Sequence, residues 1–286
     1  MQGGITGSGI AVMRVCVGAM LGLLLAGCAT AQPVAVAALS PPMAASPAGS
    51  MVPADVRRHV TQLRAALLHE VARSITDTAD GDRAWIARAQ SAAGPVVIDR
   101  TQLLVVVDRN PAVQELRIML ARPDAPWEVI GGSKVSTGQT GRRHYYITPV
   151  GAFAHTDGIL DYRALGTFNE NHIRGFGLKG MRVWDFGWQS AEKGWRADRE
   201  AGDIRLLMHA TDPDYLEQRL GRPASQGCVR IPAAMNRFLD RHGVLDADYE
   251  RAARDNRGLA ALLSRDREPT PLAGNLLVVV DSSRVE

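Results

Sequence analysis

The sequence predicts a mainly β domain with a few helices, preceded by a small helical segment. From Val96 onward, short apolar and β-branched runs alternate with glycine and proline, which is typical of many short strands. Before Val96, apolar residues recur at three- and four-residue steps, as on one face of a helix. The 286 residues, of which 46% are hydrophobic, are enough for one large domain or two small ones with a buried core.

The N-terminus predicts an exported and lipid-anchored protein. Residues 15–27 form an uncharged run of thirteen behind Arg14, too short to cross a bilayer and of the length of a signal-peptide hydrophobic region. The run leads into LLAGC, and small residues just before a cysteine resemble the lipobox of bacterial lipoproteins. We therefore assign residues 1–27 to a signal peptide and Cys28 to lipidation, at a membrane of the periplasm or cell envelope. An uncleaved anchor or an ordinary secretory signal is the alternative.

Two segments separate this leader from the strands. Residues 28–54 are rich in alanine, proline and serine and carry no charge, which predicts a flexible or partly extended tether. Residues 55–95 predict two helices, at about 55–74 and 82–93, the second ended by Gly94-Pro95. We interpret them as an accessory hairpin without chemistry of its own.

Residues 96–286 predict the main domain. A hairpin is expected where Asn110-Pro111 separates two apolar runs, and helices are expected between Ala233 and Leu263. The last apolar run echoes the first, and we interpret it as a second core strand. The expected strands lie in LLVVVD (103–108), QELRIML (114–120), WEVIGGSKVSTG (127–138), YITPVGAFAHT (146–156), MRVWDFGWQ (181–189), DIRLLMHA (203–210) and NLLVVVD (275–281).

Three aromatic side chains alternate along one of these strands. Trp184, Phe186 and Trp188 would share one face under strict alternation. A packed sheet face explains such a pattern, and the wall of a substrate groove is the functional alternative.

Charge and ligand types argue against several classes of function. The formal net charge is only +3 and there is no long block of lysine and arginine, so no dedicated nucleic-acid surface is expected. One cysteine and one histidine without a further ligand cluster make no metal site, and we expect no cofactor. His155 follows a turn, and we interpret it as a structural histidine, with the lining of a groove as the alternative.

The cysteine count draws attention to a single thiol. Cys16 would leave with the signal peptide and Cys28 would carry lipid, so Cys228 remains as the one free thiol of an exported chain. Exported cysteines usually pair as disulfides. A buried inert cysteine and a reactive nucleophile are both compatible with composition.

The surroundings of Cys228 favour the nucleophile. A thiol reacts as thiolate and needs a base or a positive environment. His209 ends an apolar strand nineteen positions earlier, and the polar loop between them could fold back to bring the two together. Gly227 allows tight backbone geometry. Pro232 suits a helix start, which predicts that the thiol lies just ahead of a helix N-terminus, where free N–H groups favour a thiolate and an oxyanion.

These residues resemble the signature of the L,D-transpeptidase family with the YkuD-type catalytic domain. That signature is a histidine, a spacer of about fifteen residues, and a block of the form Ser-x-Gly-Cys-(Ile/Val)-Arg, here His209 followed by SQGCVR at 225–230. VSTG (135–138) and TPVG (148–151) resemble the family's preceding strand and turn. The resemblance extends from about Leu103 to Asp281 and implies a β-sandwich or barrel-like catalytic domain.

The resemblance also implies a reaction and roles. Cys228 would attack the carbonyl of the third residue of a peptidoglycan stem peptide, usually diaminopimelate, and expel D-alanine; an amine would then resolve the acyl-enzyme. His209 would be the base. Backbone N–H groups at Gly227 and Cys228 would hold the oxyanion, Ser225 would support the loop, and Arg230 would organise the loop or face a substrate carboxylate.

The sequence departs from the family pattern in two places. Alanine stands at 210, where many members have glycine, and alanine disfavours positive φ. Residues 158–202 are longer than expected and could be an elaboration near the active site.

Two rival functions stay open. A cysteine hydrolase on the same scaffold would share the acyl-enzyme and differ only in using water. A non-catalytic peptidoglycan-binding lipoprotein is the third hypothesis, and the paired Cys228 and His209 argue against it.

Overall fold

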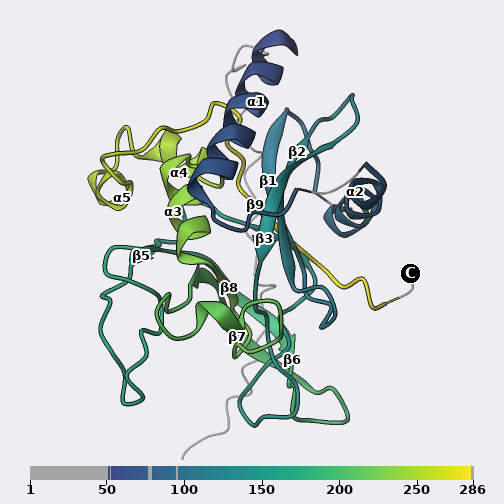
Figure 1. Cartoon of the computed structure of the whole chain (residues 1–286), viewed down its shortest axis with the longest axis vertical. Helices are drawn as coiled ribbons and strands as arrows, with labels where there is room; N and C mark the ends of the chain where they lie inside the picture. The colour runs from purple at the N-terminus through teal and green to yellow at the C-terminus, as the bar shows by residue number, and fades with distance from the viewer. Residues whose placement is uncertain (1–50, 52, 77–78, 95, 285–286) are drawn as a thin grey trace, which may run out of the picture. The chain divides into compact units, whose positions relative to one another are not determined.

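The computed structural model describes residues 51, 53–76, 79–94 and 96–284 (Figure 1). Contacts group these described residues into one compact unit. The predicted signal peptide, Cys28 and nearly all of the predicted tether lie outside the described residues. None of the described helices is long and apolar enough to cross a membrane.

The fold is mixed α/β, with 28% of residues in strands and 24% in helices. The strands form two open sheets. The expected short strands and N-terminal helices are confirmed: nine strands and three short α-helices follow residue 96, and with the two N-terminal helices the described chain as a whole is mixed α/β. Sheet faces here are covered by helices as well as by the other sheet. The helices are α1 (Pro53–Glu70), α2 (Ala79–Ala93), α3 (Ala233–Arg241), α4 (Ala247–Ala252) and α5 (Arg257–Leu262), with a 3-10 turn η1 (Glu217–Arg219). The strands are β1 (Gln102–Asp108), β2 (Glu115–Ala121), β3 (Glu128–Lys134), β4 (Gly151–Ala154), β5 (Tyr162–Arg163), β6 (Arg182–Glu192), β7 (Ala201–Ala210), β8 (Val229–Ile231) and β9 (Leu276–Val280).

The five-stranded sheet has the order β3-β2-β1-β9-β4. β1 and β2 form the expected antiparallel hairpin, and β9 pairs parallel with β1, Leu104 opposite Leu276. The two similar apolar runs are therefore neighbouring core strands. Every residue of β1 is buried, so both faces of this sheet need cover.

Helices α1 and α2 supply that cover from opposite sides. Leu67 of α1 packs in the cluster that contains Val105, whereas Trp85 of α2 packs in the cluster that contains Val106. Successive strand residues point to opposite faces. The two helices flank the sheet in Figure 1 rather than forming the expected accessory hairpin, and they are part of the core.

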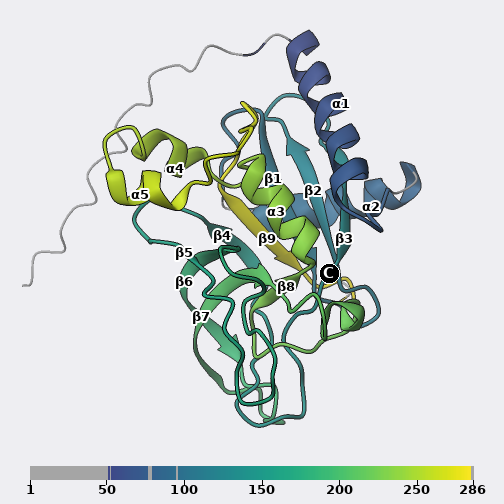
Figure 2. The ribbon, with the colours of Figure 1, turned by 60° about the vertical axis from the view of Figure 1, so that its left-hand side comes forward.

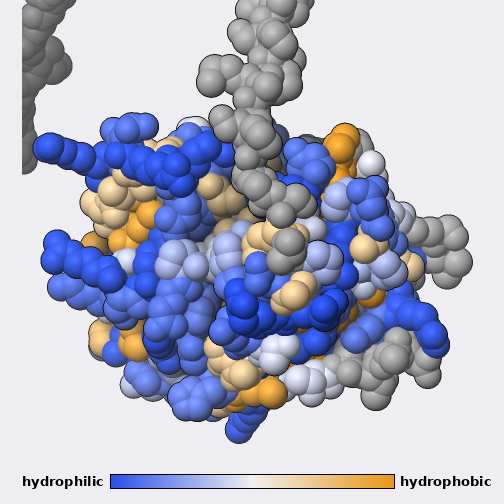
Figure 3. Space-filling model, turned by 90° about the horizontal axis from the view of Figure 1, so that it is seen from above, coloured by the Kyte–Doolittle hydropathy of each residue, from blue (hydrophilic) through white to orange (hydrophobic). Residues whose placement is uncertain are grey.

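The four-stranded sheet has the order β5-β6-β7-β8. Its inner face joins the main core through Leu206 and Met208 of β7. Its other face, here called the site face, carries Leu207, which packs in a separate cluster with Cys228. The surface seen in Figure 3 is largely hydrophilic with small hydrophobic groups, since most large apolar side chains lie in these clusters.

The shared face expected for three aromatic residues is wrong for one of them. Trp184 and Phe186 are buried in the main core, but Trp188 is 66% exposed. The pairing register of β6 with β7 shifts between Asp185 and Trp188, and Gly187 has φ +76°. This β-bulge inserts one residue and turns Trp188 to the site face.

Candidate functional site

Strands β7 and β8 bring His209 and Cys228 to one face of the sheet. The two strands lie side by side (Figure 2). They pair parallel, with Met208 opposite Val229 and His209 opposite Arg230, so Cys228 lies beside Leu207. Paired strand residues point to the same side. His209 and Cys228 are therefore diagonal neighbours on the site face, as expected if the loop between them folds back.

His209 is held in one tautomer. Its Nδ1 lies 2.8 Å from the Ala210 carbonyl oxygen, which can only accept, so Nδ1 carries the proton and Nε2 is left as acceptor. Burial lowers the pKa of His209 to about 4, with the charge of Arg230 acting in the same direction and the bond to Ala210 opposing. Ala210 ends β7 and is not among the residues with positive φ, so alanine fits there.

The Cys228 thiol is half-buried and is a free cysteine. Burial raises its pKa, while a hydrogen bond with the Leu207 backbone and the charge of Arg230 act in the opposite direction. The net effect keeps the thiol protonated near neutral pH. A neutral imidazole and a neutral thiol on one sheet face have the protonation states that general-base catalysis requires, and they form no ion pair.

The loop before Cys228 is fixed by its own serine. Ser225 is fully buried; its hydroxyl donates to the Cys228 carbonyl at 2.6 Å and accepts from the Gly227 N–H at 3.1 Å. Gly227 has φ +128°, which favours glycine. These contacts agree with the loop-supporting role expected for Ser225. They also engage the Gly227 N–H, which was expected to hold the oxyanion.

Two segments singled out in the sequence wrap this loop. Ser136 exchanges backbone hydrogen bonds with Arg230, and the Thr137 carbonyl accepts from the Ser225 N–H. The buried Thr148 hydroxyl accepts from Gly138 N–H at 2.9 Å and donates to the Gly227 carbonyl at 2.8 Å. These contacts position the cysteine, and sequence reasoning assigned no role to Thr148.

The Arg230 side chain binds the backbone of the loop that precedes Cys228. Its guanidinium donates to the Ala224 carbonyl at 3.3 Å, and burial lowers its pKa. Of the two roles expected for Arg230, these contacts favour organisation of the loop.

The expected helix N-terminus at the thiol is wrong. Strand β8 follows Cys228, and only Pro232 then caps α3. The first helical N–H, that of Ala233, donates to a Glu217 carboxylate oxygen at 3.0 Å. Three residues of strand are needed to pair with β7, so the helix begins too late to act on the sulfur.

The long segment at 158–202 reaches the site. The Phe176 ring stands edge-on to the His209 ring, with centroids 4.7 Å apart, and the buried histidine is 3% exposed. Burial and then the nearby Cys228 raise the pKa of Tyr162, whose ring also packs against Phe176. Periodicity did not single out these two residues, because Phe176 lies in a turn and the strand of Tyr162 has only two residues, too few to show alternation.

His155 lies in a different cluster. Its Nε2 is 2.9 Å from an Asp161 carboxylate oxygen and its Nδ1 is 2.8 Å from the Leu245 carbonyl. Asp161 also accepts from Arg182 at 2.7 Å, and all these side chains are buried. The structural interpretation of His155 agrees with this network.

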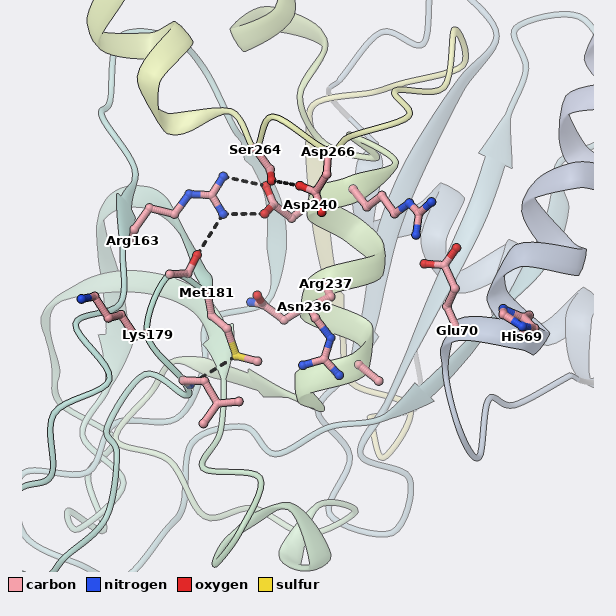
Figure 4. Close-up of a pocket in the computed structure, with 14 residues that line it drawn as sticks. His69, Glu70, Arg163, Lys179, Met181, Asn236, Arg237, Asp240, Ser264 and Asp266 are labelled. Atoms are coloured by element: carbon pink, nitrogen blue, oxygen red, sulfur yellow. Dashed lines mark hydrogen bonds and ion pairs between the residues drawn. The ribbon is translucent and has the colours of Figure 1, made fainter.

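A pocket lies elsewhere among the described residues. Figure 4 shows this pocket between the end of α1, α3 and the segment around Met181. Its volume is about 540 Å³. Most of its charges are already paired, as Arg163 is with Asp240. Neither Cys228 nor His209 lines it.

Among the residues that the structure describes, no group of three or more histidine, cysteine or acidic side chains could hold a metal ion. Neither a family model nor a curated protein matches the sequence.

Proposed function

We propose that the protein is a cysteine-dependent acyltransferase acting on peptidoglycan stem peptides, an L,D-transpeptidase with a YkuD-type domain. One observation carries the chemical part: His209, with Nε2 left as acceptor, shares the site face with Cys228 on adjacent strands. The signature around Cys228 supports the family and the substrate. The lipid anchor at Cys28 and a place in the cell envelope belong to the same proposal and rest on the LLAGC segment.

The reaction begins with proton transfer from the Cys228 thiol to His209 Nε2. The sulfur attacks the peptide carbonyl, and the carbonyl π electrons move onto oxygen. As the tetrahedral intermediate collapses, the C–N bond breaks and the His209 imidazolium returns the proton to the leaving amine. An incoming amine then attacks the thioester carbonyl and gives its proton to His209. As this second intermediate collapses, the C–S bond breaks and the His209 imidazolium returns the proton to the Cys228 sulfur.

Stabilisation of the oxyanion needs backbone donors beside the sulfur. The N–H groups of Cys228 and Gly227 are the proposed donors. Because the Gly227 N–H donates to Ser225 at 3.1 Å, it would have to leave that hydroxyl when substrate binds. The Cys228 N–H would therefore act first.

Mass spectrometry tests the proposal directly. The full-length protein in detergent is incubated with a stem tetrapeptide, with and without an amine acceptor. We expect a thioester adduct on Cys228, release of D-alanine, and a cross-linked product with the amine. Cys228→Ala should keep the thermal transition and form no adduct. Release of free tripeptide alone in the presence of the amine would identify the hydrolase instead.

A further inference from the structure

Arg205 is an arginine of the site face that the reaction above does not use. It lies on β7 two residues before Leu207, so its side chain points to the same side as Cys228. Only its Nε is engaged by Asp185, with the carboxylate oxygens at 2.8 and 2.9 Å. Asp185 is buried, whereas the Arg205 side chain is 43% exposed. The carboxylate thus orients the guanidinium and leaves its terminal nitrogens toward solvent.

The β-bulge in β6 places the Trp188 ring next to the Arg205 side chain. Trp188 pairs with Arg205 after the register shift, and the Arg205 guanidinium carbon lies 5.9 Å from the Trp188 ring centre. Without the inserted residue, Trp188 would point into the core with Trp184. The Gly187 N–H donates to Asp185 at 2.8 Å, so the bulge and the ion pair stabilise each other.

We propose that Arg205, oriented by Asp185 and flanked by Trp188, binds a carboxylate of the donor peptide. This inference rests on the proposed function and names the group recognised there: the carboxylate at the end of the side chain whose residue supplies the attacked carbonyl. The free terminal nitrogens of an arginine form the two-pronged contact that carboxylates accept. Trp188 gives an apolar platform for the methylenes that lead to that carboxylate.

Distance selects this carboxylate. Two strand residues and one strand spacing put the backbones of Arg205 and Cys228 roughly 8 Å apart. Six bonds join the attacked carbonyl carbon of diaminopimelate to its distal carboxylate carbon, which spans about 7 to 8 Å when extended. The carboxylate of the departing residue is only three bonds, about 4 Å, from the attacked carbon, whereas Asp185 on β6 holds the guanidinium on the side of β7 away from Cys228.

The test compares two donor peptides that differ only in that group. One tetrapeptide has the free side-chain carboxylate at its third residue and the other has the amide. Acylation of Cys228 in the full-length protein is followed by intact mass. We expect the acid to react about ten- to hundredfold faster than the amide, the range of a hydrogen bond to a charged group.

Variants assign the preference to Arg205. Arg205→Gln should reduce the ratio of acid to amide rates to about one, by slowing the acid alone. Arg205→Lys, which keeps a positive charge beside Asp185, should retain an intermediate ratio. Arg196→Gln is the matched control, because Arg196 is an exposed arginine paired with Asp198 at the β6–β7 turn, and its ratio should equal that of the wild type.

Several outcomes would overturn the inference. Equal rates for the two peptides on the wild type would exclude the subsite without any mutation, even though Cys228 is acylated. An unchanged preference in Arg205→Gln would place the recognition elsewhere. Acylation by neither peptide would remove the proposed function and this subsite together.

Discussion

His209 and Cys228 are both uncharged in this structure because burial acts on both in the direction that disfavours charge. Burial lowers the pKa of His209 to about 4 and raises the pKa of Cys228. The imidazole is then available as a base over the whole neutral range. In the proposed reaction the thiolate would form only as its proton is transferred, so the proposal gives His209 the role of base.

The first prediction is a pH profile with an unusually acidic lower limb. His209 loses base activity only when protonated, so the rate of Cys228 acylation should fall near pH 4 and still be close to full at pH 5.5. His209→Ala should slow acylation at pH 7 by about a hundredfold or more. A lower limb near 6.5, the ordinary histidine value, would show that the ring is exposed in solution.

The segment between β5 and β6 covers His209 and depends on one glycine. Gly177 has φ +82°, and a Cβ there would stand 2.7 Å from the Ala210 side chain and 2.8 Å from the Met181 sulfur. The neighbouring Phe176 ring lies on His209. Because Gly177 has no side chain, its backbone can lie close to Ala210 and Met181. This position brings the neighbouring Phe176 ring into contact with the His209 ring.

Gly177→Ala should displace this segment. We expect the His209 ring to become exposed and the lower limb of the acylation profile to move up from about 4 toward 6.5. Gly175→Ala is the control, since no atom lies within 4 Å of a Cβ built there and its φ is not positive. If both variants gave the wild-type profile, Phe176 would not be the cause of the low pKa.

Helix α1 belongs to the same core as the sheets. Leu67 is completely buried in the main cluster, and the next residue, Leu68, is 60% exposed. Leu67→Ala should lower the free energy of unfolding by about 2–5 kcal/mol, whereas Leu68→Ala should change it by less than about 0.5 kcal/mol. Urea unfolding measures both. Equal small effects would mean that α1 is a separable accessory.

A second pH effect concerns the whole fold. Both ring nitrogens of His155 face acceptors, Asp161 and the Leu245 carbonyl, so both donate and the ring is an imidazolium. Burial alone would lower the pKa of His155, but the hydrogen bond to Asp161 and the charges of Asp161 and Asp246 outweigh it and raise the pKa.

The sign of the stability effect follows from that raised pKa. His155 contributes fully below its unfolded value of about 6.5, and its contribution is lost as pH rises through the higher folded value. We expect the free energy of unfolding to decrease with pH above 6.5 in the wild type and to decrease less in His155→Gln. Equal slopes in the two proteins would mean that the ring is neutral in the folded state.

The local sequence was enough to predict several elements and to place the candidate pair, His209 and Cys228, on one site. β-branched runs identified β1 and β9, apolar steps identified α1 and α2, and the His209 and Cys228 pattern identified the candidate site, because these signals are periodic or contiguous. The packing of α1 and α2 on opposite faces, the bulge that turns Trp188 to Arg205, and the cover of His209 by Phe176 could not be predicted. They depend on strand register and on contacts between residues far apart in the chain, which only the tertiary structure decides. The pKa of His209 depends on the same burial, so its chemistry, unlike its identity, is a property of the fold.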